Sequence, residues 1–381
     1  MKTSKYLLTM FLFTIGITVQ AASSRTLLNF QLLGSYSDNI FQNYSPVEDY
    51  ITTGSFTIIH QTKSKITLYY NGNLNMFSQY TDLYNHNHYI GISNRQSIGD
   101  TKNDIYIGGY ARFRIDKPVY EIYDNHNYFG FASIKYYLFP TILFRAKNTL
   151  GMRTYVNYTD YSYFENVLSL NMSKFFQTRT TLQTGIDYFY KDYIEDQTYS
   201  VTSPSGLLTR TYVIDSPKVS QLLASFKIAQ SVSNLTAVQA EYLFRNTISG
   251  ENRFAELDEF YTDEVLFDDH YSYSGQEVSM SIKQFLPFQF IAVLSAYYQE
   301  KSYNHRPVYD LEGNELIEAG TRQDYQNGIS VQLEKKFSGE NIPVLKSLEL
   351  YMNYLYRVNN SNDRYYDASS GFLSAGIDAS F

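Results

Sequence analysis

Positively charged side chains recur at every second position in the middle of this sequence. Arg112 and Arg114 form one such pair, and Arg145 and Lys147 form another. In an extended strand, residues two apart project from the same face. Each pair therefore predicts two positive charges side by side on one surface, and rows of basic side chains favour anions.

The histidines suggest a second kind of chemistry. Five of the six lie at the predicted outer rim, in long connections or at the strand ends beside them: His86, His88, His126, His270 and His305. His86 and His88 share a face of an extended segment, and imidazole is a common ligand of zinc, copper and nickel. Scattered histidines in connections are more commonly plain polar residues, so we expect no metal site and no cofactor.

Motifs for catalysis are absent from the sequence. It has no phosphate-binding loop, no zinc-protease helix motif and no G-x-S-x-G elbow. We therefore expect no catalytic residue and no enzyme. A hydrolase that pairs Ser or Asp with one of the histidines is a less favoured alternative, since no spacing marks it. The net charge of −7 argues against nucleic acid as a partner.

Short stretches that alternate between apolar and polar residues must position these side chains. Alternation over about ten residues is typical of half-exposed β-strands. Sixteen such stretches occur, over residues 28–36, 50–60, 66–76, 88–98, 105–113, 128–138, 142–146, 164–172, 182–190, 222–228, 238–244, 278–282, 290–298, 325–333, 348–356 and 373–381.

The connections between these stretches alternate between short and long. Short ones fall near residues 61–65 and 139–141, for example, and long ones near 192–217 and 249–272. All eight prolines fall in predicted connections, as expected because proline lacks the N–H that a sheet interior requires. The pattern predicts an all-β, antiparallel fold with two unlike ends.

The N-terminus resembles a secretory signal peptide. A basic start, MKTSK, precedes an apolar run from Tyr6 to Val19, and small residues at Val19 and Ala21 mark a cleavage site. We predict a signal peptide over residues 1–21 and an exported chain over 22–381. The sequence has no cysteine, so it offers no lipid-anchoring residue and suits an oxidising compartment.

The C-terminal stretch GFLSAGIDASF places apolar residues at every second position and ends on an aromatic. Its apolar face consists of Leu373, Ala375, Ile377, Ala379 and Phe381. It resembles the last strand of bacterial outer-membrane β-barrels of the porin-like type. The resemblance implies that the outer-membrane assembly machinery reads these five residues. YSDNIF, residues 36–41, is weakly similar to a phrase in barrels associated with exopolysaccharide export or surface display.

Together these features predict a closed antiparallel transmembrane β-barrel of about 16 strands in the cell outer membrane of a Gram-negative bacterium. No other segment is apolar enough to span a bilayer as a helix, which leaves a closed barrel. The 39 Tyr and 26 Phe suit a membrane interface, because a tyrosine ring is apolar and its hydroxyl is wet. Outer-membrane lipid and lipopolysaccharide are the expected surroundings.

In such a barrel one face of each strand lines the lumen, and the charges there are mostly basic. We name six of them the basic wall and predict that they line a pore: Arg112, Arg114, Lys135, Arg145, Lys147 and Arg153. Glu241, Glu334 and Glu349 could neutralise these cations by ion pairing, but they are predicted on strands toward the other side of the barrel. Like charges this close are tolerable only when water or anions screen them, so we expect a wet, anion-preferring interior. The plainer interpretation is that lumen charges pair among themselves.

The predicted outer loops have the opposite sign. Acidic residues crowd the connection near 249–272, and another group comprises Asp310, Glu312, Glu315 and Glu318. Two functions follow. The first is a pore for polar or anionic solutes, including export-linked passage of a saccharide. The second is a structural or adhesive barrel with a blocked lumen that acts through its acidic loops.

Overall fold

The computed structural model describes residues 25–195, 197–202, 209–214, 218–250, 252, 270–338 and 345–381. The predicted signal peptide, residues 1–21, lies outside the described residues. Within the described ranges, no helix is long and apolar enough to cross a membrane.

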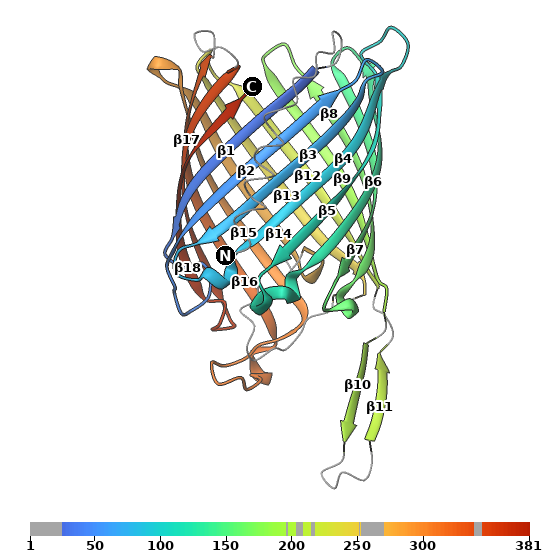
Figure 1. Cartoon of the computed structure of the whole chain (residues 1–381), viewed down its shortest axis with the longest axis vertical. Helices are drawn as coiled ribbons and strands as arrows, with labels where there is room; N and C mark the ends of the chain where they lie inside the picture. The colour runs from blue at the N-terminus through green and yellow to red at the C-terminus, as the bar shows by residue number, and fades with distance from the viewer. Residues whose placement is uncertain are drawn as a thin grey trace, which may run out of the picture.

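Sixteen antiparallel strands close into a barrel (Figure 1), which confirms the predicted fold class and strand number. In chain order the wall consists of β1 (Arg25–Ser37), β2 (Asp49–Gln61), β3 (Ile66–Phe77), β4 (Asn85–Ser97), β5 (Asp104–Asp116), β6 (Asn125–Phe139), β7 (Ile142–Tyr155), β8 (Tyr163–Phe175), β9 (Thr180–Tyr193), β12 (Lys218–Ser231), β13 (Thr236–Ser249), β14 (Ser274–Phe285), β15 (Phe290–Pro307), β16 (Thr321–Ser338), β17 (Ser347–Ser361) and β18 (Ala368–Ser380).

Two further strands lie outside the wall. β10 (Gln197–Thr202) and β11 (Thr209–Ile214) form a separate antiparallel hairpin that projects from one end of the barrel (Figure 1). Short 3-10 helices occur in the connections: η1 (Thr81–Leu83), η2 (Pro118–Tyr123), η3 (Thr159–Tyr161), η4 (His270–Ser272), η5 (Pro287–Gln289) and η6 (Ile317–Ala319). Both strands lie within the long connection predicted near 192–217.

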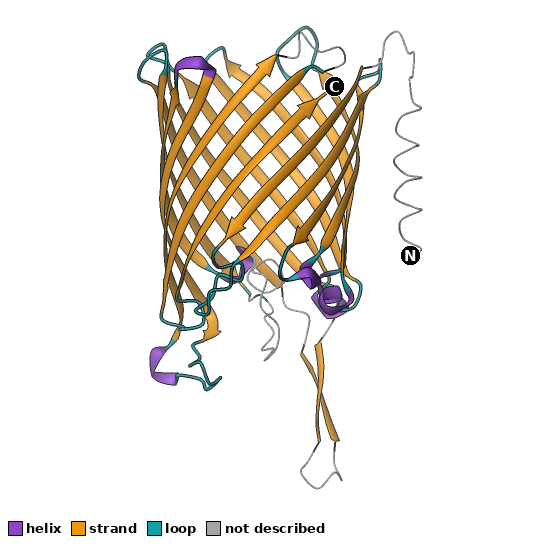
Figure 2. Ribbon diagram, turned by 60° about the vertical axis from the view of Figure 1, so that its left-hand side comes forward, coloured by secondary structure: helices purple, strands orange, loops and turns teal. Residues whose placement is uncertain are grey.

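The two ends of the barrel differ as the connection lengths predict. Short turns gather at the end where β1 begins and β18 stops, and the long connections gather at the other end (Figure 2). In outer-membrane barrels the short turns face the periplasm and the long loops face outward. We name the two ends of this barrel periplasmic and extracellular on that basis.

The wall strands present mainly apolar residues outward, and polar residues predominate on their inner faces. Leu32, Ile92 and Met280, for example, point outward and are 57%, 55% and 62% exposed. Exposure of apolar surface to water costs about 25 cal/mol of free energy per Å². So many outward apolar side chains are stable only when the barrel exterior faces lipid.

The barrel closes between its first and last strands. β1 pairs with β18 from Asn29↔Ser380 to Ser37↔Phe372. Phe381 extends this pairing, since its N–H donates to the carbonyl of Leu28 at 2.8 Å and its carbonyl accepts the N–H of Leu28 at 3.2 Å. Its ring meets the Phe30 ring edge-on, with centroids 6.1 Å apart. The final residue therefore completes the seam.

Proline placement corrects one expectation. Pro307 is not in a connection: it ends β15 and pairs with Thr321 of β16. The strand tolerates it there because the register is irregular between Ser302 and Pro307. The alternation of apolar and polar residues ends in this part of β15, because polar residues occupy both faces. For this reason the predicted strand ended at residue 298.

We predict that deletion of Phe381 destabilises the seam. The loss of two backbone hydrogen bonds at about 1 kcal/mol each should lower the free energy of unfolding by about 2 kcal/mol. Urea titration in lipid vesicles, read by the mobility of the unboiled protein on a gel, measures the change. Phe381→Tyr keeps the backbone and the ring and should remain close to the parent. Equal stability of the deletion and the parent would contradict this prediction.

Candidate functional site

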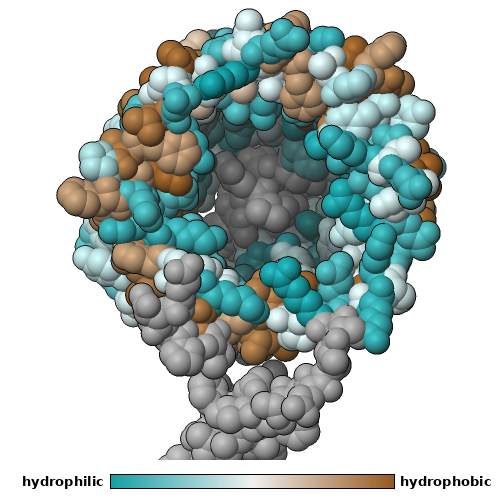
Figure 3. Space-filling model, turned by 90° about the horizontal axis from the view of Figure 1, so that it is seen from above, coloured by the Kyte–Doolittle hydropathy of each residue, from teal (hydrophilic) through white to brown (hydrophobic). Residues whose placement is uncertain are grey.

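The interior of the barrel is the candidate site because charged and polar side chains gather on its lining. Strand register places the even-numbered residues of β5 and the odd-numbered residues of β6 and β7 on one inner face. Seen from the periplasmic end, hydrophilic residues surround the opening and hydrophobic residues lie on the outer surface (Figure 3). A solute that crosses this barrel would meet polar side chains.

All six residues of the basic wall lie on this inner face. The register pairs Arg112 with Asn127 and Asn127 with Arg153, and it pairs Lys135 directly with Arg145. The basic wall therefore consists of two groups at different levels along the barrel axis. Arg112, Arg114 and Arg153 lie toward the extracellular end, and Lys135, Arg145 and Lys147 lie toward the periplasmic end.

Amides and rings hold two of the three extracellular-side arginines in place. Nη2 of Arg112 donates to Oδ1 of Asn87 at 2.9 Å, and its guanidinium lies 5.2 Å from the Tyr89 ring centroid. Nε of Arg153 donates to Oδ1 of Asn127 at 2.5 Å. Amide oxygens carry no net charge, so these contacts orient both guanidinium groups without neutralising them.

The remaining cations of the basic wall differ in their partners. Arg114 binds Asp116 through two hydrogen bonds of 2.8 and 3.0 Å. Nζ of Lys135 lies 3.9 Å from Oδ2 of Asp104. Among the described residues, Arg112, Arg145, Lys147 and Arg153 form no ion pair with a carboxylate. Four of the six positive charges therefore remain uncompensated by a salt bridge.

The carboxylates nearest to the basic wall differ from those considered in the sequence. Asp104 and Asp116 lie at the two ends of β5, where the apolar alternation that marks the strand gives out, and this is why they were missed. Glu241, by contrast, forms a 2.8 Å ion pair with Lys227 on the neighbouring strand β12. Glu241 therefore has its partner on β12, whereas Asp104 and Asp116 are the carboxylates that bind cations of the basic wall.

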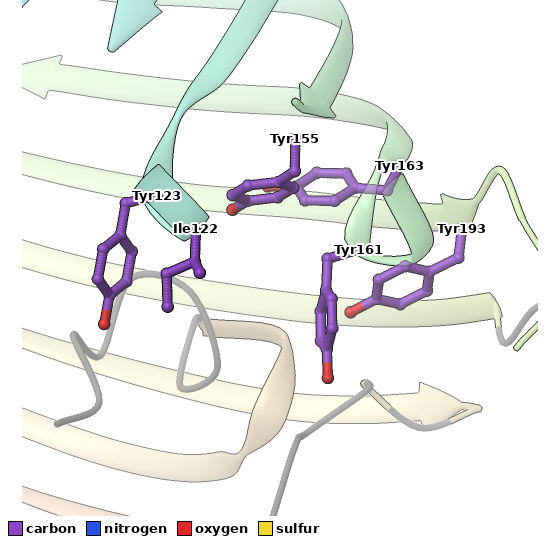
Figure 4. Close-up of a cluster of buried hydrophobic side chains, with 6 residues drawn as sticks. All are labelled: Ile122, Tyr123, Tyr155, Tyr161, Tyr163 and Tyr193. Carbon is purple, nitrogen blue, oxygen red and sulfur yellow. The ribbon is translucent and has the colours of Figure 1, made fainter. Parts of the chain in front are cut away.

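A cluster of aromatic side chains covers the inner wall at the extracellular end. Its buried members come from η2, η3 and the ends of β7, β8 and β9: Ile122, Tyr123, Tyr155, Tyr161, Tyr163 and Tyr193 (Figure 4). The rings of Tyr163 and Tyr193 meet at 6.0 Å in an edge-on arrangement. We name this set the tyrosine cluster. The sequence showed abundant tyrosine but gave no sign that these would meet.

Lys191 of β9 joins the tyrosine cluster to a distant connection. Its Nζ lies 4.1 Å from the Tyr163 ring centroid and 5.1 Å from that of Tyr271, and it donates to Oδ1 of Asn252 at 2.8 Å. Asn252 and Tyr271 belong to the connection between β13 and β14. These two described residues of the connection therefore lie against the inner faces of β8 and β9.

A second buried group ties extracellular connections to the wall. Arg322 is 2% exposed and makes two hydrogen bonds to Asp324, one of 3.0 Å from Nε and one of 2.5 Å from Nη2. Its guanidinium also lies 3.2 Å from the ring centroid of Tyr366 in the connection between β17 and β18. A buried arginine is stable there because a carboxylate and a ring both face it.

The predicted acidic loops are only partly described. Glu251, Glu256, Asp258, Glu259, Asp263, Glu264, Asp268 and Asp269 lie outside the described residues. Asp310 is described, and hydrogen bonds from Asn314, Glu312 and Gly313 hold the pKa of its carboxyl below the usual range. This loop therefore carries a firmly ionised carboxylate.

The histidine pair lies on the outer face of β4, near the extracellular rim. Nδ1 of His86 lies 3.0 Å from Nε2 of His88, and Nδ1 of His88 lies 3.0 Å from the Tyr70 hydroxyl. The two histidines do share a face, as predicted. In the described part of the chain, no three His, Cys, Asp or Glu side chains gather in a way that could hold a metal ion.

No protein-family model matches the sequence, and no curated protein matches it either. Among solved structures, OccAB3 of Acinetobacter baumannii is similar at 10% identity over 95% of this chain and 100% of that chain, with a TM-score of 0.50. OccAB1 of the same organism is similar at 9% identity, over 96% and 99% of the two chains, with a TM-score of 0.48. The loop L8 deletion mutant of OmpT, an outer membrane protein of Vibrio cholerae, matches at 10% identity over 94% and 100%, with a TM-score of 0.44.

The fold is that of a porin-like outer-membrane β-barrel. The likeness to OccAB3 extends over nearly the whole of both chains, and at 10% identity it bears on the fold alone. The closed wall and the apolar exterior independently require a membrane, because they satisfy the backbone internally and expose apolar side chains to lipid. Barrels with short turns at one end and long loops at the other reside in the outer membrane.

We predict that Lys191 holds Asn252 and Tyr271 in place against the wall. Lys191→Met removes a charge from three tyrosine rings and a donor from Asn252, and should lower the free energy of unfolding by about 2 kcal/mol. Lys191→Arg keeps the charge and should cost less. As a matched control, Lys301→Met removes a lysine that faces one ring, that of Tyr273 at 5.1 Å. Equal losses at positions 191 and 301, measured by urea unfolding, would contradict this role.

Proposed function

We propose that this protein is an outer-membrane pore that passes polar or anionic solutes. The observation that carries the proposal is the basic wall, with four cations that no salt bridge compensates on a polar inner face. Closed barrels of 16 to 18 strands are wide enough to leave an aqueous channel. The pore proposal assigns no catalytic step to the chain.

Electrostatics supports a wet interior. Lys135 and Arg145 are directly paired across neighbouring strands, so their Cα atoms are about 5 Å apart. Two positive charges that close would be costly in a dry core but tolerable in water, where the screening length is about 8 Å at physiological salt. Anions entering such a lumen would be attracted, because the positive charges on this wall reinforce one another.

The neighbouring wall supports the passage of hydroxylated solutes as well. The inner faces of β3 and β4 carry Asn71, Asn73, Asn75, Asn85 and Asn87. Nδ2 of Asn75 donates to Oδ1 of Asn85 at 2.9 Å, and Nδ2 of Asn87 donates to Oδ1 of Asn73 at 3.1 Å. Each amide has two donors and an acceptor, so hydrogen-bonding capacity remains for a sugar. Export-linked passage of a saccharide is the finer form of this proposal.

The surroundings in this proposal are those expected for an outer-membrane barrel. Lipid and lipopolysaccharide would contact the apolar exterior. The barrel-assembly machinery would read the outward face of β18, where Leu373, Ala375, Ile377 and Ala379 alternate before Phe381.

A structural or adhesive role is the second candidate. It is favoured by the hairpin of β10 and β11, which projects beyond the extracellular end of the barrel (Figure 1), and by the ionised Asp310 in the connection between β15 and β16. In this alternative the lumen would be blocked and would pass no solute. Planar-bilayer recording separates the two, since discrete conductance steps support the pore and silence supports the structural role.

We predict that the pore prefers anions and that the basic wall sets this preference. Replacing Arg112 and Arg145 with Glu should move the reversal potential in a salt gradient toward the cation side. A unit charge about 8 Å from a permeating ion in water contributes about 0.5 kcal/mol, or roughly twofold in the permeability ratio. Each substitution changes the wall by two units of charge.

The control for this prediction keeps the net charge of the lumen constant by changes on β12 and β13. Lys227→Glu combined with Glu241→Lys exchanges the partners of an ion pair and should leave the reversal potential almost unchanged. If the Arg112 and Arg145 variant left the potential at the parental value, the basic wall would lie off the conduction path.

A further inference from the structure

A large cavity opens on the inner wall at the periplasmic end of the barrel. Its volume is about 840 Å³, and its lining comes from the periplasmic ends of β2 to β8. Five cations border it: Lys65, Arg95, Lys135, Arg145 and Lys147. We name this region the basic vestibule. Three of the five, Lys135, Arg145 and Lys147, belong to the basic wall. The other two are Lys65, in a turn, and Arg95, on β4.

One carboxylate lines the basic vestibule among these cations. Oδ2 of Asp104 lies 2.7 Å from Nη2 of Arg95 and 3.9 Å from Nζ of Lys135. A single negative charge is thus divided between two cations, and the five positive charges retain a surplus of four. Asp104 therefore holds Arg95 and Lys135 in position more than it neutralises the vestibule.

Two cations of the vestibule face the lumen without a polar partner in the protein. In the described structure, Arg145 and Lys147 make no hydrogen bond or ion pair, and both are exposed. Nζ of Lys147 lies 5.2 Å from the Phe131 ring centroid. At the extracellular end, by contrast, Asn87 and Asn127 hold the guanidinium groups of Arg112 and Arg153.

The vestibule also has the size and position of a ligand site. Ligand pockets commonly measure about 300 to 1,000 Å³, so a cavity of about 840 Å³ has room for a small molecule. Its cations face the lumen and not the apolar exterior, so membrane lipid does not reach them. Arginine and lysine bind phosphate and carboxylate oxygens through charge-assisted hydrogen bonds.

We propose that the basic vestibule binds a multivalent oxyanion, a solute with several phosphate or carboxylate groups, from the periplasmic side. Arg145 and Lys147 donate the principal hydrogen bonds, and Arg95 and Lys135, oriented by Asp104, add to the field. This inference deepens the proposed pore and rests on it for the direction of transport, but binding itself needs no conduction. It identifies a loading site at the entry used for export.

Isothermal titration of the full-length mature barrel in detergent tests the proposal, with tripolyphosphate and citrate as probes. At least one probe should bind with one molecule per barrel. Arg145→Gln combined with Lys147→Gln should weaken binding by about tenfold for each cation removed, as expected for the loss of a charge-assisted hydrogen bond. Stronger binding of tripolyphosphate would identify a phosphate ligand, and stronger binding of citrate a carboxylate.

A matched control removes the same charge elsewhere in the lumen. Lys227→Gln combined with Lys283→Gln takes two positive charges from β12 and β14, which contribute no residue to the lining of the cavity, and should leave the probe affinity within about twofold. The proposal that the basic vestibule binds an oxyanion would be overturned by the absence of stoichiometric binding, or by equal weakening of binding in both double variants. Equal weakening would mean that the probe senses only net charge.

Bilayer recording separates this inference from the proposed function. Tripolyphosphate should block the current at lower concentration from the periplasmic side than from the extracellular side, and the Arg145 and Lys147 variant should lose the difference. Stoichiometric binding by a barrel that never conducts would refute the pore and keep the vestibule. Conductance without any binding of either probe would refute the vestibule and keep the pore.

Discussion

The pairing of β1 with β18 is the constraint on which the rest of the structure depends. Hydrocarbon offers no hydrogen-bond partner, so every backbone N–H and C=O in the wall must be satisfied by another strand. An open sheet would leave two unpaired edges in lipid. Closure through residues 29–37 and 372–380, extended by Phe381, removes both edges and at once divides the side chains into an outer and an inner set.

That division explains the charges inside. Because lipid accepts only apolar groups, arginine and lysine on the wall strands are directed inward, where water screens them. The contacts of these arginines and lysines differ between the two ends of the barrel. Near the extracellular end, amides and rings fix Arg112 and Arg153, whereas near the periplasmic end Arg145 and Lys147 remain open to the lumen. The same residue types therefore give an oriented lining at one end and a binding surface at the other.

The extracellular end depends on contacts that cross strands. Lys191 gathers three tyrosine rings and Asn252, and thereby holds Asn252 and Tyr271, two described residues between β13 and β14, against the inner wall. Arg322 and Asp324 perform a similar task for the last extracellular connection through Tyr366. Residues anchored by buried cations are more restricted than residues in free solvent, so these described parts of the connections hold defined positions against the wall.

The sequence by itself determined the wall: strand number, antiparallel order, the outward and inward faces, and the inner placement of all six cations in the basic wall. It could do so because a period of two is local, and one apolar face facing lipid sets the register. Only the tertiary structure decided which charges pair, that Asp104 and Asp116 serve the basic wall, that β15 continues to Pro307, and that the tyrosine cluster and Lys191 meet. Those features join residues from separate strands and connections, and their positions follow from the closing of the barrel, which no local pattern encodes.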